Sequence, residues 1–216
     1  MSNKRIFSKI YRSIPKEFFA DEDGVFGCAI SIYLTWCGIR PACIPFDGDY
    51  NDKKSISSNE MFDKMMTAKG KKCLETLSTI QSLKVVVGPY YDSGTAIVVY
   101  NVKLASMVEP LLHSIERFRQ QMERMPDRAL ELQDKIHYPL GKVLGYPCPV
   151  NLRKVINKKS YHIGFPIRNR TLLGSSCPIT PKSLALSSIL LEKMKKALAE
   201  ITNDPITLKI SIENAM

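Results

Sequence analysis

Hydrophobic residues recur at helical spacing in two long segments of the chain, residues 107–122 and 186–201. In both, apolar side chains stand three or four positions apart, which is the period of one helix face. Thr180 and Pro181 are well suited to the N-cap and first position of the second helix, and Pro126 follows the end of the first. Two long amphipathic helices are therefore predicted.

Shorter segments add further helices. The apolar residues 25–37 follow Asp21-Glu22-Asp23-Gly24 and precede Gly38, with Pro41 three positions on. Acidic residues favour a helix N-terminus and glycine favours the position after its end, so this segment is interpreted as a helix. Residues 61–66 and 72–80 are also predicted as helices, with a break at Gly70, as are residues 127–138. Residues 6–14 fit either a helix or a strand that ends at Pro15.

The clearest strand pattern covers residues 83–91 and 95–101, which are rich in Val, Ile and Tyr. Asp92-Ser93-Gly94 lies between them, and such a pair around a glycine-containing loop predicts a β-hairpin. Shorter strands are expected at 42–46, 161–167 and 206–212, and residues 47–59 are polar and turn-like. The expected fold is a single α+β domain over residues 1–216. Its sheet is mixed or antiparallel, with a central hairpin and packed helices.

Composition and cysteine spacing narrow the class of protein. Of 216 residues, 44% are hydrophobic and 24% charged, which is typical of a folded domain and argues against disorder. The N-terminus shows no signal-peptide pattern, and no apolar stretch is long enough to span a bilayer. We therefore expect an intracellular protein of the cytoplasm, nucleus or a virus particle. Six cysteines without a Cys-x-x-Cys pair favour reduced, mostly buried thiols.

The charge of the chain is unevenly distributed. Its formal net charge is +10, yet residues 135–191 contain no Asp or Glu and nine basic residues. Lysine and arginine neutralise phosphates, and interleaved aromatic residues can stack on bases. This acid-free segment predicts a non-enzymatic accessory protein that binds nucleic acid or another polyanion, the alternative being a solvated basic surface without a partner. The predicted binding residues are Arg153, Lys154, Lys158, Lys159, Arg168 and Arg170.

Acidic residues gather on both sides of the first apolar helix. Asp21 and Asp23 precede it, and Asp47 and Asp49 follow the short strand after it. If residues 18–20 and 42–46 were neighbouring parallel strands, these carboxylates would lie together at the carboxyl ends of the two strands. Such a group of carboxylates would suit Mg²⁺ or Mn²⁺. A divalent-metal-dependent phosphoesterase is therefore the alternative function. Ordinary acidic turns and helix caps also explain the same residues.

Two phosphoesterase families resemble this region in part. Asp21-Glu22-Asp23-Gly24, Gly38-Ile39-Arg40-Pro41 and Ile44-Pro45 resemble the opening of DHH-type phosphoesterases, although the Asp-His-His motif of that family is absent. The segment from Phe18 to Val25 is similar to the nucleophile motif of haloacid-dehalogenase phosphatases. Gly48 to Asp52 is similar to their late metal motif, at a much shorter separation. These resemblances imply metal-dependent phosphoester chemistry, but through two incompatible folds.

A distinctive segment surrounds Cys148. Leu144-Gly145-Tyr146-Pro147-Cys148 resembles a short signature of uncharacterised proteins, including some of large DNA viruses, and the resemblance implies no known activity. Glycines and prolines around the thiol favour close packing and a rigid backbone. Cysteine-dependent chemistry at Cys148, with His137 or His162 as base, is the second alternative function. A tight turn that closes a helix is the competing structural explanation.

Overall fold

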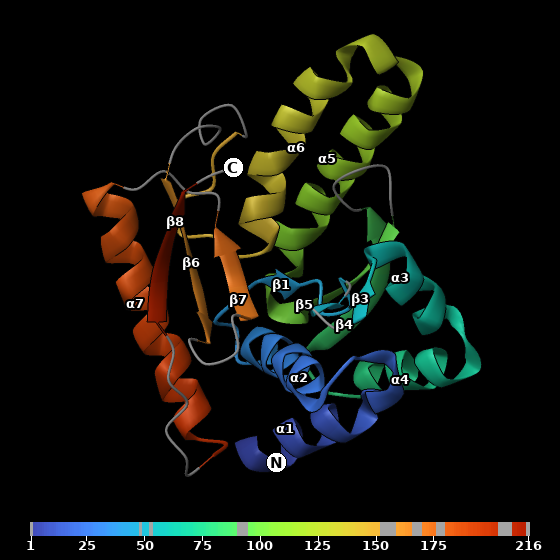
Figure 1. The fold of residues 1–216 in the computed structure, drawn as a ribbon, viewed down its shortest axis with the longest axis vertical. Helices are drawn as coiled ribbons and strands as arrows, with labels where there is room; N and C mark the ends of the chain where they lie inside the picture. The colour runs from blue at the N-terminus through green and yellow to red at the C-terminus, as the bar shows by residue number, and fades with distance from the viewer. Residues whose placement is uncertain are drawn as a thin grey trace. The chain divides into compact units, whose positions relative to one another are not determined.

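The computed structural model describes residues 2–47, 49–51, 54–89, 95–151, 159–165, 170–175, 180–202 and 209–214. The chain divides into two compact units (Figure 1). Unit 1 comprises Met1–Gly88 and Gly94–Ala105, and unit 2 comprises Pro89–Ser93 and Ser106–Met216. The single domain expected over the whole chain stays a prediction.

Unit 1 is a small antiparallel sheet with helices packed on it. The sheet has the strand order β1-β5-β4, in which Ala42 lies opposite Tyr100 and Cys43 opposite Val99. The elements of unit 1 are α1 (Asn3–Ser13), the short 3-10 helix η1 (Lys16–Phe18), α2 (Glu22–Trp36), β1 (Ala42–Cys43), β2 (Asp49–Asn51), β3 (Lys54–Ile56), α3 (Ser58–Met66), α4 (Ala68–Ser78), β4 (Leu83–Pro89), β5 (Thr95–Asn101) and the 3-10 helix η2 (Val102–Leu104).

The core of unit 1 lies where α2 meets the sheet. Helix α2 and helix α3 both pack on β5, and α1 packs on α2 and on α4. Ile30, Tyr33 and Leu34 of α2 are completely buried, as is Val99 of β5. Burying side chains of this size contributes about 1.5–3 kcal/mol each, so this contact supplies much of the stability of the unit.

Helix α2 confirms its prediction at both ends. The side chain of Asp21 accepts a hydrogen bond from the backbone N–H of Gly24 at 2.9 Å, which caps the N-terminus. After the helix, Gly38 has φ +72°, a conformation that glycine adopts without strain. The amide of Asn101 donates to the carbonyls of Thr35 and Trp36 at 3.1 and 2.9 Å, which fastens the end of β5 to the last turn of α2.

The break between α3 and α4 is where the prediction at Gly70 is wrong. The chain turns at Thr67, whose hydroxyl caps α4 by accepting from the N–H of Gly70 at 3.4 Å. Gly70 lies inside α4, and a Cβ atom there would overlap the backbone of Met65. Glycine is therefore needed for the close approach of two helices and not for a break.

The described part of the polar residues 47–59 forms two short strands and the start of a helix, where a turn is expected. Strands β2 and β3 pair there in antiparallel fashion, with Tyr50 opposite Ser55. Helix α3 then begins with a capping box, in which Ser57 and Glu60 satisfy each other's backbone N–H groups. Polar strands of three residues leave no hydrophobic alternation from which to predict them.

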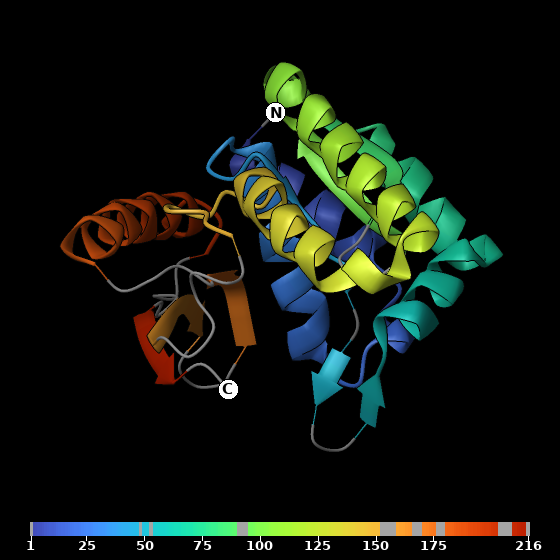
Figure 2. The same ribbon diagram turned by 90° about the horizontal axis from the view of Figure 1, so that it is seen from above.

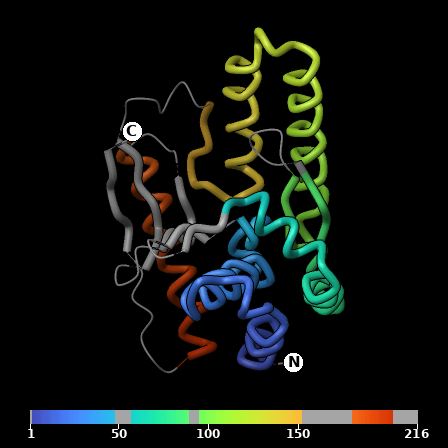
Figure 3. The backbone as a smooth tube through the Cα atoms, turned by 45° about the vertical axis from the view of Figure 1, so that its right-hand side comes forward, coloured from blue at the N-terminus to red at the C-terminus, as the bar shows by residue number. Residues whose placement is uncertain are grey.

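Unit 2 combines helices with a second three-stranded antiparallel sheet. The sheet has the order β7-β6-β8, and α7 packs along β8 (Figure 2). Helices α5 and α6 run side by side in opposite directions (Figure 3). The elements of unit 2 are α5 (Ala105–Arg124), the 3-10 helix η3 (Pro126–Arg128), α6 (Ala129–Val143), β6 (Lys159–Phe165), β7 (Arg170–Ser175), α7 (Pro181–Ala199) and β8 (Lys209–Asn214).

The α+β class is confirmed, and so are most of its elements. Strands β4 and β5 are hydrogen-bonded neighbours, as the hairpin prediction requires. Thr180 caps α7 and Pro181 occupies its first turn, again as predicted. Two helices contain a proline in their interior, Pro110 in α5 and Pro139 in α6. Strand β7 has no counterpart among the predicted strands. No helix within the described residues is long and apolar enough to cross a membrane.

Candidate polyanion-binding groove

Helix α1 separates hydrophobic from basic side chains. Ile6 and Ile10 are buried on one side, with Ile10 completely inaccessible. Arg5, Lys9 and Arg12 lie four and three positions apart, so they form a row along a single side of the helix. Residues 1–16 contain no Asp or Glu, and this row therefore has no acidic neighbour on its own helix.

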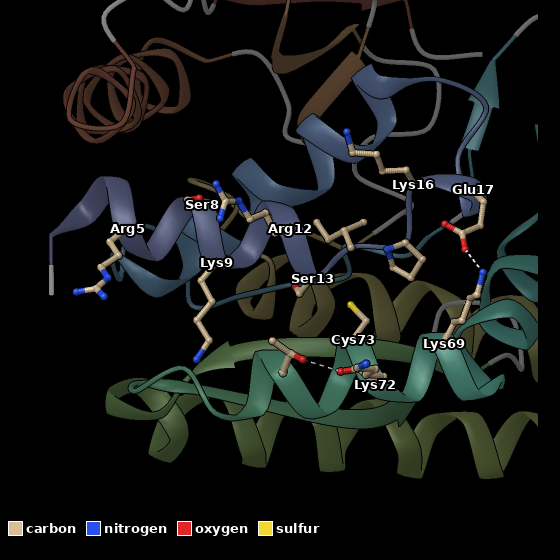
Figure 4. A pocket seen from close by; sticks show the side chains of 13 residues that line it. Arg5, Ser8, Lys9, Arg12, Ser13, Lys16, Glu17, Lys69, Lys72 and Cys73 are labelled. Atoms are coloured by element: carbon tan, nitrogen blue, oxygen red, sulfur yellow. Dashed lines mark hydrogen bonds and ion pairs between the residues drawn. The ribbon is translucent and has the colours of Figure 1, made fainter.

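Helix α4 forms the opposite side of a groove in unit 1. Lys69 and Lys72 line it from α4, and Lys9 extends toward α4 from α1 (Figure 4). The amine of Lys9 donates to the hydroxyl of Thr79 at 2.9 Å, a neutral partner that leaves its charge uncompensated. The groove has a volume of about 970 Å³ and is lined by Arg5, Ser8, Lys9, Arg12, Ser13, Ile14, Pro15, Lys16, Glu17, Lys69, Lys72, Cys73 and Thr76.

Two of the six basic residues in the groove are paired with acids. Lys69 Nζ lies 2.6 Å from Glu17 Oε1, and this bond lowers the pKa of the Glu17 carboxyl (Figure 4). Lys16 Nζ lies 3.0 Å from Glu22 Oε1, which raises the pKa of the lysine. Both pairs are solvent-exposed, so each stabilises the fold only slightly.

The other basic side chains keep their charge available. In the part of the chain that the structure describes, Lys9 has the neutral Thr79 as its hydrogen-bond partner, and Arg5, Arg12 and Lys72 have no acidic partner. The described residues lining the groove include one carboxylate, Glu17, beside six cations. The potential there is therefore positive, and it can attract a ligand with several negative charges.

A buried thiol lies at the bottom of this groove. Burial raises the pKa of Cys73 to about 11, and a hydrogen bond with the Ser13 side chain opposes that shift. The thiol is therefore neutral at physiological pH, so it neither reduces the positive potential nor acts as a nucleophile. The hydroxyl of Ser8 also lines the groove and can donate a hydrogen bond to a phosphate oxygen. The hydroxyls of Ser13 and Thr76 line it too, but they donate to the carbonyl oxygens of Ile10 and Lys72 at 2.7 and 2.8 Å.

The basic residues predicted from the acid-free segment are only partly covered by the structure. Arg153, Lys154, Lys158 and Arg168 lie outside the described residues. Lys159 begins β6, opposite Asn214 of β8, and Arg170 begins β7, opposite Phe165 at the far end of β6. At about 3.3 Å per residue, roughly 20 Å of strand separates these two positions. The sheet therefore does not bring them together.

Two of the four aspartates of the predicted metal site, Asp21 and Asp47, accept hydrogen bonds that fix local structure. Asp21 is the N-cap of α2 and Asp23 lies in its first turn. Asp47 accepts a hydrogen bond from the Ser58 hydroxyl at 2.9 Å, and Asp49 begins β2. Within the described part of the chain, no three His, Cys, Asp or Glu side chains form a cluster that could hold a metal ion. The antiparallel sheet of unit 1 also lacks the parallel strands on which the prediction depended.

The segment around Cys148 forms the turn that follows α6. Gly145 has φ +77°, and a Cβ atom on Gly141 would lie 2.9 Å from Pro149 Cβ. His137 is buried, with its Nδ1 atom 2.7 Å from the carbonyl oxygen of Val150. One ring nitrogen of this candidate base therefore holds the turn. His162 lies in β6, and Cys148 is partly exposed and forms no disulfide.

A signal for the groove is present in the sequence. Basic residues at positions 5, 9 and 12 share the helical period with apolar residues at 6, 10 and 14 on the opposite side. The contribution of α4 could not be predicted in this way, because it depends on the packing of α1 against a helix about 60 residues further along the chain. No protein-family model, no curated protein and no solved structure matches the chain.

Proposed function

We propose that this chain is a non-enzymatic accessory protein that binds a phosphate-bearing polyanion, and that the groove between α1 and α4 is its binding surface. The observation that carries the proposal is the concentration of uncompensated charge. Arg5, Arg12 and Lys72 project from two packed helices without an acidic partner in the described residues. Positive charge that no acid compensates attracts phosphates and releases their counterions.

The residues lining the groove favour binding over catalysis. Among its described lining residues, the one thiol is neutral and the one carboxylate is bound to Lys69. General acid-base or nucleophilic chemistry requires a group whose pKa is matched to the reaction, and neither side chain meets that requirement. The six basic residues of the acid-free segment remain a predicted second surface for the same class of ligand.

The test is a comparison of two variants with the same change in charge. Arg12→Ala/Lys72→Ala removes two cations from the groove, and Lys71→Ala/Lys103→Ala removes two exposed cations of unit 1 that do not line it. Fluorescence anisotropy with labelled heparin and a labelled oligonucleotide, over a series of salt concentrations, measures affinity. Circular dichroism and thermal melting establish that both variants are folded.

We expect the groove variant to lose about tenfold or more in affinity and its salt slope to fall by about 2, because each lost phosphate contact removes about one unit. The control variant should stay within about threefold of the wild type, since it changes only the long-range field. Equal losses in the two variants would show that net charge alone drives binding. Failure of the wild type to bind either ligand at low salt would disprove the proposed function.

A further inference from the structure

The groove is lined by residues that contact phosphates but not bases. Among its thirteen described lining residues there is no Phe, Tyr, Trp or His, while six are Lys or Arg and three carry hydroxyl groups. Proteins that bind single-stranded nucleic acid tightly use aromatic side chains as stacking platforms, each worth about 1–3 kcal/mol per base. A surface without such platforms gains little from exposed bases.

Aromatic residues close to the groove are engaged elsewhere. The hydroxyl of Tyr11 donates to Glu22 at 2.9 Å, and its ring packs edge-on against Phe26. Phe7 packs edge-on against Phe26 and Tyr33 at ring-centre distances of 5.9 and 5.7 Å. These rings belong to the α1–α2 contact, and none of them lines the groove.

The spacing of the basic row matches a phosphate backbone. Arg5 and Arg12 are seven residues apart, which corresponds to about 10 Å along the helix axis at 1.5 Å per residue. One strand of a duplex presents a phosphate about every 3.4 Å of its axis but winds around that axis, so consecutive phosphates lie further apart than this and the row can reach about two of them. A duplex also carries about twice the charge per unit length of either strand, and it hides its bases from a surface that cannot use them.

We infer that the groove binds duplex nucleic acid by the sugar–phosphate backbone of one strand, without reading its bases. This inference rests on the proposed function and specifies its ligand. Arg5, Lys9 and Arg12 follow the backbone from α1, and Lys72 approaches from α4. The hydroxyl of Ser8 supplies a neutral hydrogen bond to a phosphate oxygen. Contacts of this kind position a protein on a duplex but carry no sequence information.

The experiment measures the binding of five labelled ligands to the full chain. They are a 20-base-pair DNA duplex, an RNA duplex of the same length, one DNA strand alone, the same strand with abasic sites throughout, and heparin. The groove variant Arg12→Ala/Lys72→Ala and the control Lys71→Ala/Lys103→Ala are measured with each ligand. A second duplex with a shuffled sequence tests base readout.

We expect the DNA duplex to bind about tenfold more tightly than its single strand, because of its higher charge density. The shuffled duplex should bind equally, the abasic strand should match the normal strand, and only the groove variant should weaken duplex binding. If the RNA duplex binds more tightly than the DNA duplex, the ligand is double-stranded RNA. If the DNA duplex binds more tightly, the ligand is double-stranded DNA.

Three results would overturn the inference and leave the proposed function intact. A normal single strand that binds more tightly than the duplex would show that bases contribute. An abasic strand that binds more than threefold more weakly than the normal strand would show the same. Binding of heparin without binding of any duplex would show that the ligand is a different polyanion. Absence of binding to every ligand, heparin included, would remove the proposed function as well.

Discussion

The groove of unit 1 and the helices α5 and α6 of unit 2 contain the same basic residue types but neutralise them differently. In unit 2, Arg119 pairs with Glu116 and Glu123 on its own helix at 2.9 and 2.6 Å. Glu131 similarly pairs with Arg128 and Lys135 within one turn of itself. On α1, by contrast, no acidic residue accompanies Arg5, Lys9 or Arg12.

This difference separates charge that stabilises a helix from charge that is available to a ligand. Pairs at i,i+3 and i,i+4 contribute about 0.2–0.5 kcal/mol each to their own helix and cancel at a distance. A basic row without acids gives no such local gain and leaves a field that extends about 8–10 Å into physiological salt solution. The density of Lys and Arg in the sequence is therefore a weaker guide to a binding surface than the spacing of acids around them.

Charge reversal gives the largest effect expected from this comparison. Arg5→Glu/Arg12→Glu/Lys72→Glu should reduce polyanion affinity by about 100-fold or more near physiological salt, because repulsion replaces three attractive contacts. The matched variant Arg153→Glu/Lys154→Glu/Lys158→Glu changes the net charge equally within the acid-free segment, and we expect a loss below about tenfold. Anisotropy titrations of both variants check this expectation. A larger loss in the second variant would move the binding surface to that segment.

Replacement of a closely packed glycine should lower the free energy of unfolding by different amounts in the two units. In Gly70→Ala the new methyl would overlap the Met65 backbone, which cannot move without separating α3 from α4. In Gly141→Ala it would meet the side chains of Pro149 and Tyr146 at 2.9 and 3.0 Å, in a turn that can shift.

We expect Gly70→Ala to lower the free energy of unfolding by about 2–3 kcal/mol and Gly141→Ala by about 1 kcal/mol. Urea denaturation of both variants measures these losses, with the exposed neighbour Lys71→Ala as a control that changes little. Because α4 carries Lys69 and Lys72, Gly70→Ala should also weaken polyanion binding at temperatures where it remains folded. The opposite order of stabilities would mean that the α3–α4 corner adapts more easily than the turn after α6.

The sequence predicts the local features of this fold better than its long-range ones. Asp21, Gly38 and Thr180 act through neighbours within a few residues, so their caps and turns follow from spacing alone. The break predicted at Gly70 is wrong because the glycine is required by its contact with the backbone of Met65. That contact exists only once α3 and α4 are packed together.

The candidate site follows the same rule. The row Arg5, Lys9 and Arg12 is visible as a helical period, but the groove exists only because α4 lies beside α1. The acid-free segment stands out in the sequence because nine basic residues occur there without an acidic residue. Strand pairing nevertheless places Lys159 and Arg170 toward opposite ends of β6. A run of basic residues without acids therefore predicts a shared surface only where a regular period places those residues on one face.

Removal of the Glu17 carboxylate should have a smaller effect, an increase in polyanion affinity. Its carboxylate occupies Lys69 at 2.6 Å and so competes with any phosphate that approaches this end of the groove. Glu17→Gln removes that competitor and should raise polyanion affinity severalfold at low salt, because one more cation becomes available. Glu75→Gln makes the same charge change on α4 outside the groove and serves as the control. Equal gains in both variants would exclude a specific role for Glu17.

The smallest effect concerns the locally paired acids of unit 2. Hydrogen bonds with Lys135 and Arg128 lower the pKa of Glu131 from 4.5 to about 2. The stabilisation from this depressed pKa is present above pH 4.5 and is lost as the pH falls toward 2. Glu131→Gln should therefore melt slightly below the wild type at pH 7, and the difference should disappear near pH 2. Glu131→Gln and the wild type should have the same polyanion affinity at neutral pH, since the charge of Glu131 is neutralised by nearby residues of the chain and lies outside the groove. A change in affinity as large as that of Glu17→Gln would break the distinction between charge paired within a helix and charge left open to a ligand.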